Sequence, residues 1–168
     1  MKRIDEETFI SVYDEHADAI FRYAYFRLYD RERAKEIVQE AFMKTWEYLA
    51  SGKKISNVRA FLYRTVHNLS VNEAVRHKSY SLDEMHEVAG FDPAEVKENT
   101  PDTEAEYRLV LAKIEELEPA ERDVILMRYV EGLPVNEIAQ ALEEAPNTVS
   151  VRIHRALKKL RGTLDLEP

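Results

Sequence analysis

Residues 133–161 read LPVNEIAQALEEAPNTVSVRIHRALKKLR, which is two segments of helical periodicity with a short turn between them. The apolar face of the first segment comprises Val135, Ile138, Ala139 and Leu142. Residues 143–146 supply the turn. Asn147 is suited to cap the second segment, because its side chain accepts a hydrogen bond from an unpaired backbone N–H. A short helix, a tight turn and a longer helix together predict a helix-turn-helix.

The second helix, from residue 147 to about residue 164, divides into two faces when successive residues are placed about 100° apart. The buried stripe comprises Val149, Ile153, Ala156, Leu157 and Leu160, and the opposite face comprises Thr148, Val151, His154, Arg155 and Lys158. Val151 favours DNA binding, because in a major groove it can contact a thymine methyl while Arg155 reaches a guanine edge. Arg152, Lys159 and Arg161 flank this face and suit phosphates. The alternative is a basic surface helix that is only solvated.

The net charge of −8 argues at first against a nucleic-acid partner, but the charge is unevenly distributed. Lys and Arg number 14 against 12 Asp and Glu in residues 1–80, and 7 against 7 in residues 122–168. Residues 81–121 hold 3 basic and 13 acidic residues. Within the flanking parts, residues 53–78 hold 6 basic residues and 1 acidic residue, and residues 145–162 hold 5 basic residues and no acidic one. The chain therefore has two basic stretches, joined by an acidic segment.

The first 80 residues predict a bundle of at least three helices. Apolar residues follow one helical stripe in each of the segments 9–24, 34–49 and 61–75, and three matched stripes can close one small core. Asp30 is expected to cap the second helix and Ser56 the third. Four shorter helices are expected near residues 103–117, 119–130, 134–142 and 147–164.

The segment between these groups lacks a sustained period and contains Gly90, Pro93 and Pro101, so it is interpreted as a linker. The predicted fold is thus all-α, with two small domains. They span residues 1–80 and 104–168, the second holding the helix-turn-helix, and residues 81–103 form an acidic linker between them.

A second candidate DNA-binding element lies at residues 57–78, where amide and basic side chains form a polar ribbon opposite the apolar stripe. The ribbon comprises Arg64, His67, Asn68, Asn72 and Arg76. Lys53 and Lys54, in the loop before it, could hold a displaced strand while an aromatic ring stacks on an unpaired base. For Phe61 and Tyr63, the pattern alone favours a place in the core.

Several classes of function are disfavoured by the composition. The chain has no cysteine, which excludes disulfides and thiolate metal sites, and the five histidines show no paired ligand spacing. No apolar run approaches the roughly 18 residues of a membrane span, so a cytoplasmic protein without membrane insertion is expected. There is no phosphate-cradling glycine loop or clustered catalytic group, so an enzyme is disfavoured and no cofactor or metal is predicted.

Taken together, the two halves resemble the extracytoplasmic-function (ECF) group of bacterial σ factors over nearly the whole chain. Asp30-x-x-x-Ala34-x-x-Ile37-Val38-Gln39-Glu40-x-Phe42-x-x-x-Trp46 is similar to the polymerase-binding helix of that group. Phe61-Leu62-Tyr63-x-x-x-x-Asn68-x-x-x-Asn72-x-x-x-Arg76 resembles its helix for promoter melting and −10 recognition. Leu117-x-Pro119-x-x-Arg122, Glu131-Gly132-Leu133, Glu137-Ile138-Ala139 and Thr148-Val149-x-x-Arg152-x-x-Arg155-Ala156 resemble its −35-recognition domain.

The resemblance implies three partners: the clamp helices and flap of core RNA polymerase, promoter DNA, and an anti-σ factor. It assigns polymerase binding to Asp30, Ile37, Gln39, Glu40 and Lys44. It assigns −10 contacts to Lys53, Lys54, Phe61, Tyr63, Arg64, Asn68, Asn72 and Arg76. It assigns −35 contacts to Arg122, Thr148, Ser150, Val151, Arg152, His154, Arg155 and Lys158.

The sequence departs from the group at four of these motif positions. Phe61 stands where Trp is frequent, and Asn72 where Asp is usual, which could change a helix contact or a base preference. Asn147 replaces an expected glycine, and His67 replaces a basic residue, so phosphate attraction there would vary with pH.

Two further points follow from the resemblance. In related factors the linker threads through polymerase, so the acids Asp83, Glu84, Glu87, Asp92, Glu95 and Glu98 could mimic nucleic acid in a positively charged channel; a solvated tether is the alternative. The other candidate function is a decoy that sequesters an anti-σ factor without touching DNA. A decoy has no use for the basic charge of residues 147–161, which argues against it.

Overall fold

The computed structural model describes residues 5–77 and 101–163, and of residues 74–77, 101–104 and 107 it describes the backbone alone. Within these ranges the chain is all-α and contains no strand, which confirms the predicted fold class. The helices are α1 (Glu6–Leu28), α2 (Arg31–Ala50), α3 (Val58–His77), α4 (Pro101–Glu115), α5 (Pro119–Ile125), the π-helical turn η3 (Leu126–Val130), α6 (Val135–Leu142) and α7 (Pro146–Thr163). None of these described helices is long and apolar enough to cross a bilayer.

Helices α1, α2 and α3 form the first domain, and their boundaries follow from capping side chains. Asp5 accepts from the backbone N–H of Thr8 at 2.9 Å and starts α1, and Asp30 accepts from Arg33 at 3.0 Å and starts α2, as predicted. The third cap is Asn57 and not Ser56, because the Asn57 side chain accepts from the backbone N–H of Ala60 at 3.0 Å.

The second domain holds α4 to α7 and contains the predicted helix-turn-helix, with a shifted start of its second helix. Pro146 occupies the first turn of α7, a position that tolerates its missing N–H. The backbone N–H of Val149 donates to the Ala145 carbonyl at 3.2 Å. Asn147 therefore lies inside the first turn, and the expected Asn147 cap is wrong.

Two residues with left-handed backbone turn the chain on either side of α6. Gly132 has φ of 70° and ends η3, where the lack of a side chain removes the steric cost. Glu143 has φ of 55° and ends α6, so a residue with a Cβ adopts a conformation that favours glycine. The turn of the helix-turn-helix is thus strained at Glu143.

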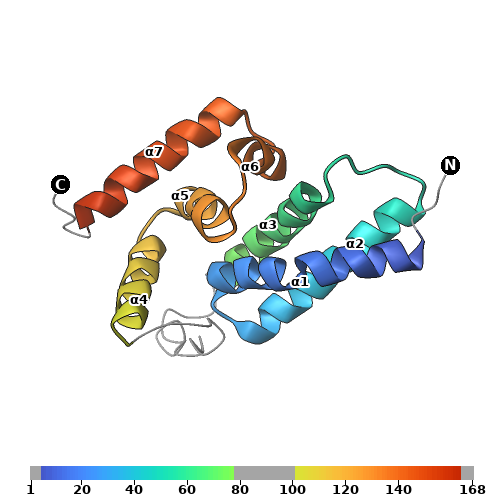
Figure 1. Cartoon of the computed structure of the whole chain (residues 1–168), viewed down its shortest axis with the longest axis horizontal. Coiled ribbons are helices and arrows are strands. Elements are labelled where there is room, and N and C mark those ends of the chain that lie inside the picture. Colours follow the sequence, from blue (N-terminus) through green and yellow to red (C-terminus); the bar gives the residue numbers. More distant parts are fainter. Residues whose placement is uncertain (1–4, 78–100, 164–168) are drawn as a thin grey trace.

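The two domains pack against each other, whereas the sequence predicted only that a linker joins them. Buried residues of both domains belong to one cluster, which joins Tyr23 and Leu62 to Ile125 and Ile138. Helix α6 packs on α3, and Figure 1 shows α5 and α6 lying between α7 and the α1–α3 bundle. The described structure is a closed arrangement of the two domains.

Candidate nucleic-acid interface

Helix α7 presents the face that the sequence predicted for a major groove. Val149, Ile153, Ala156 and Leu160 are buried against the rest of the second domain. On the other side, Thr148, Ser150, Val151, His154, Arg155 and Lys158 are exposed. Val151 exposes 45% of its surface on this face, where it is accessible to a thymine methyl group.

Two of the cations that flank this face are engaged by carboxylates of their own domain. Arg152 contacts Glu144 at 2.5 and 3.1 Å, and Lys159 Nζ lies 2.8 and 3.0 Å from the Glu121 carboxylate. Lys159 thus ties α7 to α5, and its contact with phosphates stays a prediction. Within the described part of the chain no ion pair engages Arg155 or Lys158.

Arg122, predicted to contact the −35 region, has a structural partner in this arrangement. Its Nη2 donates to the Glu115 carbonyl at 2.7 Å and to the Leu117 carbonyl at 3.2 Å. The Glu115 carbonyl ends α4 and the Leu117 carbonyl lies in the turn before α5, so the guanidinium fastens the end of α4 to α5. The position of Arg122 is thereby fixed by α4.

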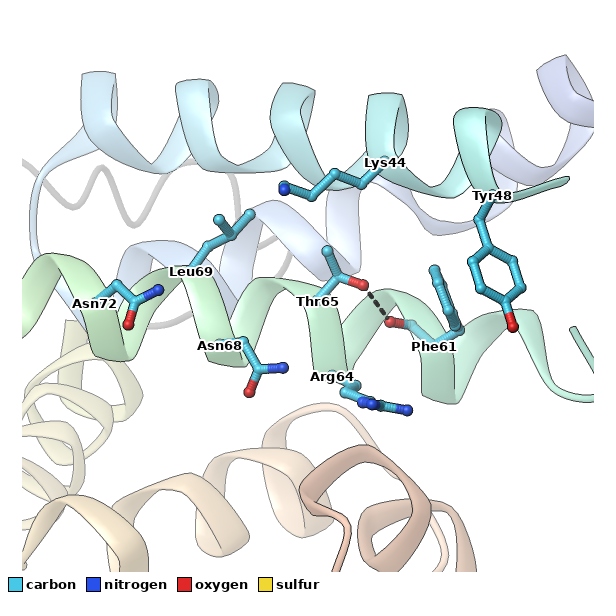
Figure 2. A pocket seen from close by; sticks show the side chains of 8 residues that line it. All are labelled: Lys44, Tyr48, Phe61, Arg64, Thr65, Asn68, Leu69 and Asn72. Carbon is cyan, nitrogen blue, oxygen red and sulfur yellow. Dashed lines mark hydrogen bonds between the residues drawn. The ribbon is translucent and has the colours of Figure 1, made fainter. Parts of the chain in front are cut away.

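A pocket of about 430 Å³ lies between α2 and α3 on the first domain. It is lined by Lys44, Tyr48, Phe61, Arg64, Thr65, Asn68, Leu69 and Asn72. Figure 2 shows Lys44 and Tyr48 coming from α2, and the amides of Asn68 and Asn72 coming from successive turns of α3. The pocket is within the roughly 300–1,000 Å³ of small-ligand sites, and its amides and aromatic rings suit one unstacked nucleobase.

The aromatic end of this pocket is built from both helices. The rings of Tyr48 and Phe61 lie 5.0 Å apart, and Lys53 Nζ lies 5.0 Å from the Tyr48 ring centroid. Thr65 donates to the Phe61 carbonyl at 2.8 Å, so its hydroxyl is occupied within α3. Lys53 is therefore placed beside the rings, where it can attract a phosphate of a strand that enters the pocket.

The structure brings together Phe61, Arg64, Asn68 and Asn72 of the residues predicted for −10 contacts. Lys54 is exposed in the preceding loop, and the side chain of Arg76 lies outside the described residues. Sequence reasoning missed Tyr48, Thr65 and Leu69 and assigned Lys44 to polymerase. Tyr48 and Lys44 are four residues apart on α2, and only their position opposite α3 reveals the shared pocket.

Tyr63 is a core residue, which fits the interpretation that the pattern alone favoured. It exposes 1% of its surface, and its hydroxyl donates to Glu131 Oε2 of the second domain at 3.0 Å. Burial, with the nearby Glu131 carboxylate, raises the pKa of Tyr63 above its usual value. In this closed arrangement its ring is not available to DNA.

The residues assigned to polymerase binding include both exposed and buried side chains. Gln39, Glu40 and Lys44 are exposed on α2, and Asp30 caps that helix. Ile37 exposes only 1% of its surface and belongs to the core. The accessible part of the predicted surface is thus Gln39, Glu40 and Lys44, with a 3.8 Å ion pair between the last two.

A buried polar cluster joins α1, α3 and α5 beneath the interface. Asp123 lies 2.9 Å from Arg27 Nε, 3.5 Å from His67 Nδ1 and 3.4 Å from the Tyr23 hydroxyl. Burial raises the pKa of Asp123. Burial also lowers the pKa of His67, and this effect exceeds the opposite effect of the Asp123 charge, which raises that pKa. His67 is therefore held by the second domain and does not stand as a free phosphate contact.

Comparison with known proteins identifies the family. The family model "Sigma-70 region 2" matches residues 12–80, and "Sigma-70, region 4" matches residues 107–160. The chain is 30% identical to the ECF RNA polymerase sigma factor SigW of Bacillus subtilis, over 98% of this chain and 92% of SigW. It is 31% identical to SigL of Mycobacterium tuberculosis, over 92% of this chain and 87% of SigL.

The chain belongs to the ECF σ factors of RNA polymerase. Its fold resembles that of RpoE from Bartonella quintana, solved with the anti-sigma factor NepR, with a TM-score of 0.75 at 19% identity. That likeness covers 95% of this σ factor and 98% of RpoE. CnrH, solved with the cytosolic domain of CnrY, gives a TM-score of 0.71 at 21% identity, covering 98% and 92%.

Proposed function

We propose that this ECF σ factor binds core RNA polymerase in the cytoplasm, contacts the −35 element through α7 and captures an unpaired −10 base in the pocket between α2 and α3. The observation that carries the proposal is the pocket lined by Phe61, Asn68 and Asn72. A ring for stacking and two amides for base edges are the groups that recognise an extruded base.

The division of work between the helices follows from their shapes. Helix α7 packs on its own domain through a buried stripe and exposes the opposite face, which suits insertion into the major groove of a duplex. The pocket in α2–α3 is concave and suits a single base that has left the stack. Duplex binding is thus assigned to α7 and capture of the melted strand to α3.

Promoter opening in this scheme requires no catalytic group on the chain. Unstacking and unpairing a base costs a few kcal/mol, and stacking on an aromatic side chain returns about 1–3 kcal/mol per base. Binding of the extruded base by Phe61 and the two amides offsets that cost. Nucleotide addition is the task of the polymerase.

An anti-σ factor is proposed as the regulatory partner. Support comes from RpoE and CnrH, whose structures were solved with the anti-sigma factor NepR and with CnrY. The exposed α2 residues Gln39, Glu40 and Lys44 are the surface we assign to core polymerase, so a partner that covers them would prevent holoenzyme formation.

Transcription in vitro tests the proposal. Core polymerase loaded with this σ factor is given a library of bacterial genomic fragments, and the 5′ ends of transcripts are sequenced. We expect initiation at defined sites that share two upstream elements, and loss of that initiation with Asn68→Ala in the pocket. Core polymerase alone is the control. Transcripts without defined starts would refute the function.

A further inference from the structure

The second domain places four carboxylates on basic side chains of the first domain. Glu131 accepts from Arg22 at 2.7 and 2.9 Å, and Glu137 accepts from Arg59 at 2.6 and 2.7 Å. Two single contacts complete the set. They join Glu143 to Arg64 at 2.5 Å and Asp123 to Arg27 at 2.9 Å.

These contacts differ from ordinary surface ion pairs. Two of them are bidentate, the geometry in which a guanidinium binds a carboxylate most specifically. The Glu131 side chain is 1% exposed and that of Asp123 is 4% exposed, so each carboxylate would be costly to bury without its cation. The interface therefore depends on these charges being matched.

The same contacts occupy groups that a nucleic acid would need. Arg64 lines the proposed −10 pocket, and Arg59 lies five residues earlier on α3. A guanidinium binds phosphate and carboxylate through the same fork of N–H donors. Glu137 and Glu143 thus stand where phosphates of a strand along α3 would otherwise bind.

The closed arrangement also conflicts with simultaneous contact to both promoter elements. Elements named −10 and −35 are about 25 base pairs apart, or roughly 85 Å at about 3.4 Å per base pair. Helix α6 packs directly on α3, and α7 begins four residues after α6 ends. Because a helix with its side chains is only about 10–12 Å across, α7 lies far closer to α3 than that span.

We propose that Asp123, Glu131, Glu137 and Glu143 form a charge latch that holds the isolated σ factor closed and keeps Arg59 and Arg64 from DNA until polymerase separates the domains. This inference rests on the proposed function of α3. The carboxylates act as an internal competitor for the phosphate sites. The free chain is then autoinhibited, and the latch opens when polymerase binds both domains.

The first experiment measures domain separation in the full chain. The chain contains no cysteine, so Glu47→Cys and Gly162→Cys give one dye site on each domain. Glu47 is exposed, and a side chain at Gly162 would meet nothing within 4 Å. The latch variant combines Glu131→Gln, Glu137→Gln and Glu143→Gln, leaving Asp123 in place to preserve the buried cluster.

The matched control variant removes the same charge from the same domain. It combines Glu106→Gln, Glu116→Gln and Glu118→Gln, at exposed positions. We expect high energy transfer in the unmodified chain and the control, and a marked loss of transfer in the latch variant. Circular dichroism establishes that each variant keeps its helices. High transfer in a helical latch variant, or low transfer in the unmodified chain, would overturn the latch.

The second experiment measures DNA binding without polymerase, by anisotropy of a fluorescent 15-nucleotide single strand of mixed sequence. We expect the latch variant to bind at least 10-fold more tightly than the unmodified chain, and the control variant to change by less than about 2-fold. The variant Arg59→Gln/Arg64→Gln should open the domains without this gain, because it removes the phosphate sites as well. Equal gains in latch and control variants would contradict competition.

Holoenzyme transcription separates failure of the latch from failure of the proposed function. If the unmodified holoenzyme initiates at defined promoters while the latch variant stays closed, the latch is wrong and the function stands. If no defined initiation occurs, the proposed function of α3 fails, whatever the energy transfer shows.

Discussion

Helices α3 and α7 are the two elements that we propose to bind DNA, and in the described structure their basic faces differ in accessibility. The outer face of α7, with Val151 and Arg155, is exposed to solvent. Along α3, Arg59 and Arg64 are engaged by carboxylates of the second domain. The closed form therefore leaves α7, the helix proposed for the duplex, accessible, and restricts α3, the helix proposed for the melted strand. This difference in accessibility suits a factor that finds promoters only within a holoenzyme.

The largest expected effect comes from removing the pocket's ring with Phe61→Ala. Stacking of a base on an aromatic side chain is worth about 1–3 kcal/mol, so open-complex formation should weaken by up to about 3 kcal/mol. Binding of holoenzyme to the closed duplex should change little, because α7 is untouched. Phe61→Trp, which keeps a ring, is the matched control and should retain opening. Equal loss in both variants would argue against stacking.

Next in size is Arg155→Ala on α7, which should weaken −35 binding by about 2 kcal/mol and relax preference at one base pair. Lys158→Ala should instead weaken all sequences alike and lower the salt slope of binding by about one unit. Binding of holoenzyme to matched and mismatched sites at several salt concentrations distinguishes these effects. Identical profiles for the two variants would remove the distinction between base and phosphate contacts.

Lys159→Ala provides an internal comparison on the same helix. Since Lys159 already pairs with Glu121, its loss should leave the salt slope near that of the unmodified chain. It should lower the free energy of unfolding, because the Glu121 side chain is only 11% exposed and loses its charged partner. A salt slope that falls as far as in Lys158→Ala would show that DNA displaces Glu121.

A smaller effect is expected at the strained turn. Glu143→Gly should relieve the left-handed backbone and raise the free energy of unfolding by about 1 kcal/mol relative to Glu143→Gln. Both variants lack the carboxylate that contacts Arg64, so the comparison isolates backbone strain from the ion pair. Urea unfolding of the two variants measures it. A glycine variant no more stable than the glutamine variant would exclude strain at this turn.

The smallest effect is a pH dependence at His67, which faces Tyr23, Arg27, Asp123 and Glu144. Burial lowers the pKa of His67 below 6.5, so under mildly acidic conditions the unfolded chain binds more protons than the folded chain. Stability should therefore fall as pH drops below 6.5. The pKa of Asp123 is raised above 3.8, so at pH values just above 3.8 the folded chain binds more protons than the unfolded chain. In that pH range Asp123 makes the chain more stable as the pH falls, which is the opposite of the His67 effect.

Urea unfolding at pH 7.5 and 5.5 measures this dependence. The unmodified chain should lose more stability than His67→Gln over that interval, because only the unmodified chain carries the imidazole that takes up a proton on unfolding. An equal loss in the two chains would place the pH dependence elsewhere.

Local chemistry made much of each domain predictable from sequence. The stripe from Val149 to Leu160 follows from helical periodicity, and Asp30 caps α2 because its side chain can reach the free N–H of Arg33. Ser56 and Asn57 are both competent caps, and periodicity does not choose between neighbours. Helix α7 begins at Pro146, one residue before the predicted start at Asn147, for the same reason: Pro146 and Asn147 are neighbours and both favour the start of a helix.

Contacts between distant segments escaped the sequence analysis. Glu131 and Arg22 lie 109 positions apart, and charge patterning along one helix gives no sign of such a pair. Arg122 and Lys159 looked like DNA contacts because cations in a DNA-binding motif are usually interpreted so, yet carbonyls and a carboxylate of their own domain hold them. The pocket proposed for a −10 base needed the same long-range information, since half of its aromatic end comes from Tyr48 on α2.

The division of work between α3 and α7 is tested most directly by permanganate footprinting of unpaired thymines on a promoter found in the genomic library. Holoenzymes carrying Phe61→Ala and Arg155→Ala are compared at concentrations that saturate the promoter. The Phe61→Ala holoenzyme should occupy the promoter without thymine reactivity at −10, whereas the Arg155→Ala holoenzyme should need a higher concentration but then open it fully. Full reactivity with Phe61→Ala at saturation, or none with Arg155→Ala, would contradict the account.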